Sequence, residues 1–279
     1  MSIKKSITGF KRGAARRAAH QANMRIRHFI CARYWRGHSV HSPFVYHIVR
    51  HVISGRHHDS GLTDAVSRYR SDLLADGSQL LVGSIGAVSR EPRLRRVCDI
   101  ARQTATSDKY GRLLARLAQE MRPDGILELG TSMGVSTAYM AVACPAACVL
   151  TLEGLDAVAC AARRHLEAAG LTGVTVMSGD IDERLPEALD ALPDGKVEMA
   201  FIDANHSREA TLRYFEALAR RRADKCLLVF DDIYWSAGMT EAWRAIVADG
   251  RVMTTIELPR MGLAFFRPGC QKEHYVVRW

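Results

Sequence analysis

Acidic residues are missing from the start of this 279-residue chain. Residues 1–58 contain twelve lysines and arginines but no aspartate or glutamate. Residues 59–279 carry all 30 acidic residues against 27 basic ones, so the net charge of +9 belongs to an N-terminal extension and not to the body of the chain. Such an extension favours contact with RNA, an anionic surface or an acidic partner. The alternative is a tail that is basic only for solubility.

Long apolar runs and paired cysteines are also absent. No apolar run reaches 18 residues, so the sequence predicts no transmembrane helix. The seven cysteines are scattered without a C-x-x-C pair, which is typical of reduced thiols that pack among apolar residues. No uninterrupted apolar segment follows the basic N-terminus. We therefore expect no secretory signal and a protein of the cytoplasm.

A third absence concerns nucleotide binding. Residues 126–137 read ILELGTSMGVST, an apolar run followed by a glycine-bracketed turn and the start of a helix. Gly130 and Gly134 allow a sharp bend and a close approach to a ligand, and the first N–H groups of a helix favour negative charge. Counted from Gly130, the dinucleotide fingerprint requires glycine where this chain has Ser132 and Val135. The turn therefore predicts a nucleoside-containing ligand other than NAD.

From residue 124 onwards, short apolar segments alternate with helical patterns. Strands are predicted at 126–129, 148–152, 174–177, 197–202, 226–230, 252–258 and 263–267. Helices are predicted between them, at 135–143, 155–169, 184–192, 207–222 and 239–248. This alternation is typical of an α/β fold with a doubly wound, mostly parallel, Rossmann-like sheet of seven strands. The turn at 259–262 makes the last strand antiparallel.

The first hundred residues predict a helical extension. We expect a helix from Ala14 to Trp35, because Gly9 and Gly13 discourage an earlier start. The remaining patterns are helices at 43–53, 62–74, 97–104 and 110–121, an apolar run at 79–82 and an arginine-rich surface loop at 87–96. Residues 1–106 are thus expected to form a basic extension and helical cap, and residues 107–279 the ligand-binding domain.

Acidic residues stand where the predicted strands end, which is where a doubly wound sheet binds its ligand. They are Glu128, Glu153, Asp180, Asp203, Asp231 and Asp232. We expect Glu153 to accept hydrogen bonds from ribose hydroxyls, with a solvated strand-end acid as the alternative. Asp180 follows Gly179 and is a candidate for contact with an adenine ring or its amino group.

The glycine turn together with Glu153 resembles the class I S-adenosylmethionine-dependent methyltransferases. The similarity covers about residues 107–267 and is greatest to catechol and caffeoyl-CoA O-methyltransferases and to macrolide-sugar O-methyltransferases. It implies that Ser136 holds the cofactor's carboxylate and that Glu153 holds its ribose. The rest of the implied cofactor site is Glu128, Gly130, Thr131, Ser132, Gly134 and Asp180.

Three of the strand-end acids suggest a metal. Asp203, Asp231 and Asp232 offer a hard, all-oxygen set of ligands suited to Mg²⁺. The resemblance implies that these acids bind a divalent metal, which positions the acceptor oxygen and lowers its pKa. It also places His206 near the general base, so the candidate catalytic residues are His206 and Asp203. The alternatives are an Asp203 that only lines a pocket and an Asp pair that caps a helix.

Three functions remain open from the sequence. The first is a Mg²⁺-dependent O-methyltransferase for a small hydroxylated acceptor, with Tyr234 and Trp235 either walling its pocket or packing in the core. The second is an RNA-directed methyltransferase whose basic extension grips phosphate. The third is a non-catalytic binding protein, which the complete cofactor motif argues against. A homodimer is a further expectation, and the acceptor itself cannot be read from the sequence.

Overall fold

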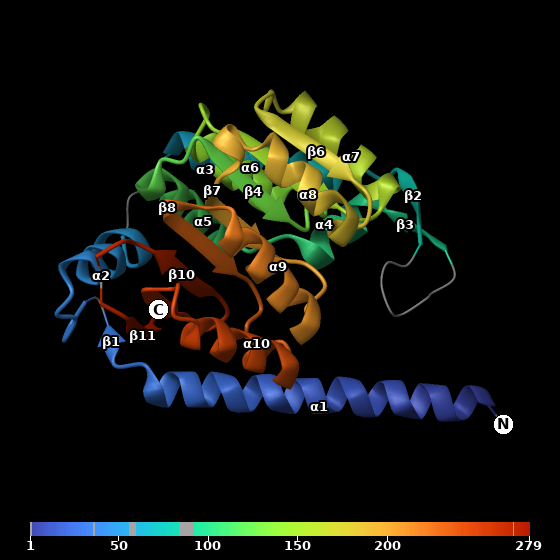
Figure 1. Ribbon diagram of the computed structural model, residues 1–279. Coiled ribbons are helices and arrows are strands. Elements are labelled where there is room, and N and C mark those ends of the chain that lie inside the picture. The colour runs from blue at the N-terminus through green and yellow to red at the C-terminus, as the bar shows by residue number, and fades with distance from the viewer. Residues whose placement is uncertain (1, 36, 56–59, 84–91, 270) are drawn as a thin grey trace.

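The structure is a computed structural model that describes residues 2–35, 37–55, 60–83, 92–269 and 271–279. One sheet organises the chain (Figure 1). Its strands are β1 (Tyr34–Trp35), β4 (Gly125–Leu129), β5 (Cys148–Glu153), β6 (Val174–Ser178), β7 (Val197–Ile202), β8 (Arg222–Phe230), β9 (Thr254–Glu257), β10 (Gly262–Phe266) and β11 (Glu273–Arg278). They lie in the order β1-β11-β9-β10-β8-β7-β4-β5-β6.

The seven predicted strands are all present, and their directions are as expected. Strands β8, β7, β4, β5 and β6 pair in parallel. Strand β10 runs antiparallel to both of its neighbours, β8 and β9. The doubly wound sheet with an antiparallel last strand is thereby confirmed. The carboxyl ends of β4, β5, β7 and β8 consequently meet at one edge of the sheet.

Two strands extend the sheet beyond the predicted seven. Strand β11 pairs in parallel with β9, and β1 pairs in parallel with β11. Neither strand was predicted from the sequence, because β1 has only two residues and β11 follows a polar stretch. In β11 the side chains of Tyr275 and Val277 alternate into the core, which is the pattern of a strand with one buried face.

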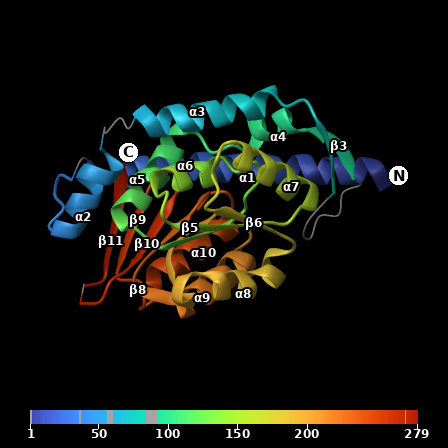
Figure 2. The same ribbon diagram turned by 90° about the horizontal axis from the view of Figure 1, so that it is seen from above.

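Helices cover both faces of the sheet (Figure 2). One face carries α8 (Ile181–Ala191), α9 (Arg208–Arg220) and α10 (Ala237–Ala248), with a short 3₁₀ turn at Pro193–Gly195. The other carries α5 (Asp108–Met121), α6 (Val135–Ala143) and α7 (Asp156–Ala168). Strand β4 is buried along its whole length. Glu128 is therefore a carboxylate placed inside an apolar layer.

The N-terminal extension begins with one long helix, α1 (Ser2–Cys31). The expected start at Ala14 and end at Trp35 are both wrong. Two early glycines cost a helix only about 1 kcal/mol each, and the surrounding alanines, lysines and arginines are good helix formers. The second half of α1 packs on the body, where Met24 and His28 are buried. Its first half runs past α10 along the edge of the molecule (Figure 1).

The rest of the extension covers the helical layer that contains α5 and α6. It consists of α2 (Pro43–His47), a π-helical segment (Ile48–Ile53), α3 (Ser60–Ala75) and α4 (Val97–Thr104). Strands β2 (Gln79–Val82) and β3 (Arg93–Arg96) form a separate antiparallel pair. The predicted surface loop at 87–96 is therefore wrong at residues 93–96, because β2 takes them as its strand partner, and residues 87–91 lie outside the described residues.

Candidate active site

The glycine turn connects β4 to α6 at the edge where the strands end. Gly130 has a φ of +101°, and its N–H donates to the carbonyl of Leu152 at the end of β5. A Cβ at this position would lie 2.2 Å from the carbonyl oxygen of Asp203, which follows β7. The turn thus fits only glycine here. Through Gly130, the turn contacts both the end of β5 and the end of β7.

Glu128 anchors the start of α6 from below the turn. Its carboxylate is fully buried and accepts hydrogen bonds from Ser136 Oγ at 2.6 Å, Thr151 Oγ1 at 2.6 Å and Thr137 Oγ1. Burial raises the pKa of Glu128 to about 6, and the three hydroxyl donors oppose that rise. Ser136 therefore lies within the Glu128 network, and its role toward a cofactor carboxylate stays a prediction.

Glu153 lies across the turn from Ser132. Its Oε2 accepts from the backbone N–H of Ser132 at 2.8 Å, and its Oε1 accepts from Leu155 N at 3.0 Å. Thr131 Oγ1 lies 2.6 Å from Thr151 Oγ1. Burial raises the pKa of Glu153, and these backbone donors lower it. The structure thus brings the predicted ribose acid and the predicted turn residues together.

Asp180 lies at the end of β6 and is exposed. It caps α8, because its carboxylate accepts from the N–H of Asp182 at 2.8 Å. Its neighbour Gly179 donates to the carbonyl of Glu153 at 3.0 Å, which keeps Asp180 beside the predicted ribose position. Capping of α8 accounts for the acid at this position, and contact with adenine stays a prediction.

The second half of the site lies at the ends of β7 and β8. Asp203 and His206 follow β7, and His206 Nε2 is 3.4 Å from Asp203 Oδ1. Asp231 and Asp232 follow β8. Arg260 reaches both from the turn between β9 and β10: its Nε lies 2.8 Å from Asp231 Oδ1 and 3.0 Å from Asp232 Oδ1, and its Nη2 lies 2.5 Å from Asp231 Oδ2. This arginine was not among the site residues predicted from the sequence.

Burial and crowding shift the titration of these groups. Burial is the main cause of the raised pKa of both Asp203 and Asp231; Arg260 opposes the rise at both, and neighbouring carboxylates add to it. Burial likewise lowers the pKa of His206, against the pull of Asp232 and Asp231. An imidazole with a lowered pKa is neutral near pH 7 and can accept a proton.

The backbone in this half of the site adopts left-handed conformations at three non-glycine residues. Asn205 has a φ of +60°, His206 of +38° and Asp232 of +49°. Such conformations cost of order 1–3 kcal/mol each and cluster at functional sites. Trp235 N donates to the carbonyl of Asp232 at 2.8 Å, and the Trp235 ring lies 5.7 Å from that of His206. The two strained turns bring the rings of His206 and Trp235 together, tilted by 41° to each other.

The aromatic residues divide between the site and the core. Trp235 is 39% exposed, and its carbonyl accepts from Gln21 of α1 at 3.2 Å. The ring of Tyr110, at the start of α5, lies 5.6 Å from the Arg260 guanidinium. Tyr234 is buried, and its hydroxyl donates to Glu257. Of the two predicted wall residues, Trp235 therefore borders the site and Tyr234 belongs to the core.

The donor set at Asp203, Asp231 and Asp232 does not fit a divalent metal. Mg²⁺ would need oxygens of Asp231 that already accept hydrogen bonds from Arg260 and an oxygen of Asp232 that is ion-paired with it. Among the described residues, no three His, Cys, Asp or Glu side chains are placed to hold a metal ion. The predicted magnesium site is thus replaced, in this arrangement, by an arginine–carboxylate cluster.

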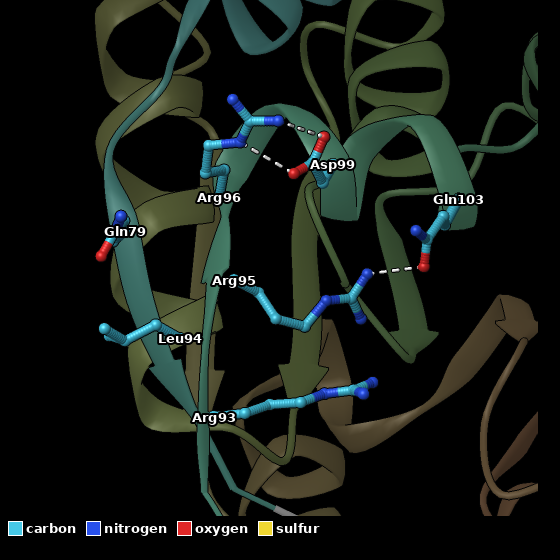
Figure 3. Close-up of a pocket in the computed structure, with 7 residues that line it drawn as sticks. All are labelled: Gln79, Arg93, Leu94, Arg95, Arg96, Asp99 and Gln103. Carbon is cyan, nitrogen blue, oxygen red and sulfur yellow. Dashed lines mark hydrogen bonds and ion pairs between the residues drawn. The ribbon is translucent and has the colours of Figure 1, made fainter.

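A separate cavity lies beside the β2–β3 pair (Figure 3). Its volume is 740 Å³, and arginines of β3 dominate its wall. Arg96 is held by Asp99, and Arg95 Nη2 donates to Gln103 at 2.6 Å. The cavity lies away from Arg260, although α4 touches the glycine turn through Thr104, whose Oγ1 is 2.6 Å from Ser132 Oγ. The strand ends, and not this cavity, hold the groups suited to catalysis.

Comparison with known proteins places this geometry in a family. Residues 127–233 match the sequence model of a methyltransferase domain. The chain is 30% identical over 172 residues to a catechol O-methyltransferase of Niastella koreensis, covering 61% of this chain and 73% of that protein. An O-methyltransferase from Bacillus cereus in complex with SAH is similar in structure, with a TM-score of 0.52, 20% identity and coverage of 75% of this chain and 91% of that one. TomG of Streptomyces achromogenes, solved with SAM, gives a TM-score of 0.51 at 21% identity, over 80% and 95% of the two chains.

Sheet, glycine turn and strand-end acids together define a class I methyltransferase, whose methyl donor is S-adenosylmethionine. The chain belongs to the S-adenosylmethionine-dependent O-methyltransferases of that class. No helix in the described part of the chain is both long and apolar enough to cross a membrane.

Proposed function

We propose that the protein methylates a hydroxyl group of a small acceptor that binds between the ends of β7 and β8, the start of α5 and α1. The observation that carries this proposal is the group formed by His206, Asp203 and Arg260, which adjoins the glycine turn through the contact between Gly130 and Asp203. The name of its relative, catechol O-methyltransferase, supports a small aromatic acceptor. Tyr110 and Trp235 would flank such a ring.

The proposed chemistry divides between donor and acceptor sides. When bound, S-adenosylmethionine supplies a methyl group that moves from sulfur to the acceptor oxygen as the carbon–sulfur bond breaks. Asp203 holds the His206 ring through Nε2. Nδ1 of His206 has no hydrogen-bond partner among the described residues, and in this proposal it takes the proton from the acceptor hydroxyl. The lowered pKa of His206 keeps it ready for that role near pH 7.

The metal-dependent form of this reaction finds no support at the site. The expectation of Mg²⁺ rested on three carboxylates, and here Asp231 and Asp232 contact Arg260 while Asp203 lies beside His206. The proposed reaction therefore has no step through a metal ion. Neither alternative function is supported at the site. Among the described residues of the site, no feature favours RNA. A protein that only bound the cofactor would not need the second group of side chains at the ends of β7 and β8. Location in the cytoplasm and a homodimer both stay predictions.

Product detection tests the proposal most simply. The chain would be incubated with S-adenosylmethionine carrying a deuterated methyl group and with a panel of catechols, phenols and hydroxylated sugars. Mass spectrometry should find a deuteromethyl ether of at least one acceptor. His206→Gln should lower kcat by about 100-fold or more, because a general base contributes 10²–10⁴.

The matched control is His47→Gln, which removes a half-exposed histidine paired with Glu120 outside the site. It should keep full activity. Two results would contradict the proposal: an unchanged kcat for His206→Gln, or no labelled ether from any acceptor by a chain that binds the cofactor.

A further inference from the structure

The Arg260 guanidinium is a positive charge that the surrounding residues hold in a fixed position in the site. It makes a two-point contact with Asp231, whose side chain is fully buried, and a third contact with Asp232. Such fork geometry is specific to arginine and among the strongest of charge-assisted contacts. The arginine's own backbone is fixed as well, because its carbonyl accepts from Ile233 N at 3.1 Å. The cation is therefore held from both ends.

Part of this guanidinium is open to a ligand. The Arg260 side chain is 35% exposed, although Asp231 beneath it is not. Within the described part of the chain, Nη1 of Arg260 has no hydrogen-bond partner. A donor of fixed charge with an unpaired NH₂ group suits an oxygen that carries or gains negative charge. A hydroxyl that loses its proton to His206 would become such an oxygen.

We propose that Arg260 takes the place of the divalent metal, compensating Asp231 and Asp232 and donating to the ionised oxygen of the acceptor. Only the part of this inference that concerns the acceptor oxygen rests on the proposed function. It has two consequences: methyl transfer needs no divalent cation, and the carboxylates become a metal site only when the guanidinium is removed. The substrate class that it favours is an acidic hydroxyl, such as that of a phenol or catechol.

Manganese binding provides a readout that does not depend on activity. Mn²⁺ would be titrated into the chain and free Mn²⁺ followed by electron paramagnetic resonance. The wild-type chain should leave the free signal unchanged, whereas Arg260→Ala should bind one Mn²⁺ per chain. The matched control is Arg251→Ala, which removes an arginine of the same exposure, 34%, that forks onto Asp249 away from the site. This control should bind none.

Activity gives the second readout. Wild-type turnover should survive EDTA, and Arg260→Lys should lower kcat about 100-fold while cofactor affinity is kept, because a lysine retains the charge but loses the fork. The Lys variant also keeps the test valid should Arg260→Ala fail to fold. One Mn²⁺ bound per wild-type chain, or turnover abolished by EDTA and restored by Mg²⁺, would overturn the inference. Failure of the acceptor panel would refute the proposed function but leave the Mn²⁺ result standing.

A second inference rests on a different surface, the outward side of α1. Ile26, Phe29 and Ile30 are 60%, 61% and 74% exposed and are spaced at i, i+3 and i+4, so they share one helix face. The opposite side holds Met24 and His28, which are buried against the body. The Arg278 guanidinium lies 4.1 Å from the centre of the Phe29 ring, and Ile26 and Ile30 continue this apolar stripe as exposed side chains on the outer helix face.

Charge decides what covers this stripe. Exposed arginines flank it at positions 25 and 27, and residues 1–58 contain no acid. A second copy of the chain would bring two strongly basic helices together, which like charges oppose. RNA would satisfy the arginines and stack a base on Phe29, but it would gain little from Ile26 and Ile30. We infer that the stripe lies on an anionic lipid surface, which takes both apolar and basic groups of one helix.

Vesicle co-sedimentation tests this surface. The chain should sediment with phosphatidylcholine vesicles that contain phosphatidylserine and stay in solution with phosphatidylcholine alone. Ile26→Ser/Phe29→Ser/Ile30→Ser should lose most of the bound fraction. The matched control is Leu81→Ser/Leu94→Ser, which removes two leucines of similar exposure, 61% and 63%, from the β2–β3 pair. The inference would be overturned if the triple variant bound the vesicles as well as the wild-type chain does. It would also be overturned if the stripe bound RNA and not vesicles, or if the wild-type chain formed a dimer that the triple substitution abolished.

Discussion

Gly130→Ala tests the contact on which both halves of the site depend. Gly130 has a φ of +101°, and its added Cβ would meet the carbonyl oxygen of Asp203 at 2.2 Å, where contacts under 3.0 Å essentially never occur. The left-handed conformation costs about 1–2 kcal/mol, and forcing two backbone segments apart adds about 1–3 kcal/mol. We expect Gly130→Ala to lower the free energy of unfolding by about 2–5 kcal/mol.

Gly170→Ala is the matched control. Gly170 also has a positive φ, +75°, but nothing lies within 4 Å of its Cβ position. It should lose only the conformational part, about 1–2 kcal/mol. Urea unfolding of both variants measures the difference, provided their m-values agree. Calorimetry should also show at least tenfold weaker S-adenosylmethionine binding for Gly130→Ala alone. Equal losses of stability in the two variants would show that the close contact between residue 130 and Asp203 has no energetic cost.

Three further predictions follow from single groups. The kcat of the wild-type chain should fall on the acid side as pH drops through the lowered pKa of His206, below its ordinary 6.5, and a pH–rate series should show that His206→Gln lacks this limb. Because the pKa of Glu128 is raised from 4.5 to about 6, the folded state favours the protonated acid, and the free energy of unfolding should fall by about 2 kcal/mol as pH rises through that range. Urea unfolding of Glu128→Gln over the same pH range should lack this fall. Tyr69→Phe leaves the Met133 carbonyl without its 2.8 Å donor and should cost about 1–2 kcal/mol in urea unfolding; no change would show that water replaces the hydroxyl.

Local sequence patterns were sufficient for most of the fold. Continuous apolar runs such as 226–230 occur where a strand is buried on both faces, and that burial is confirmed for residues 226–230 of β8 and 199–202 of β7. The glycine turn was equally readable, because Gly130 and Gly134 both need a positive φ that few other residues adopt. Strand β3 was not predictable in this way, because its arginine-rich sequence forms a strand only by pairing with β2.

The site was less predictable than the fold, because its decisive contacts join distant parts of the chain. Arg260 is 28 residues beyond Asp232 and sits in a turn, where an arginine gives no signal of its own. Its fork onto Asp231 turns a predicted metal site into an ion-paired cluster. Likewise, nothing local shows that Ser132 donates its backbone N–H to Glu153. Strand-end acids identify a site in this fold, but their partners decide its chemistry.

Isothermal titration of the wild-type chain with S-adenosylmethionine, in buffer that contains EDTA, tests the central claim most directly. We predict one binding site per chain, formed by the glycine turn and Glu153 without any metal, and a clear loss of that binding in Gly130→Ala. The absence of binding heat at high micromolar cofactor from a folded wild-type chain would contradict it.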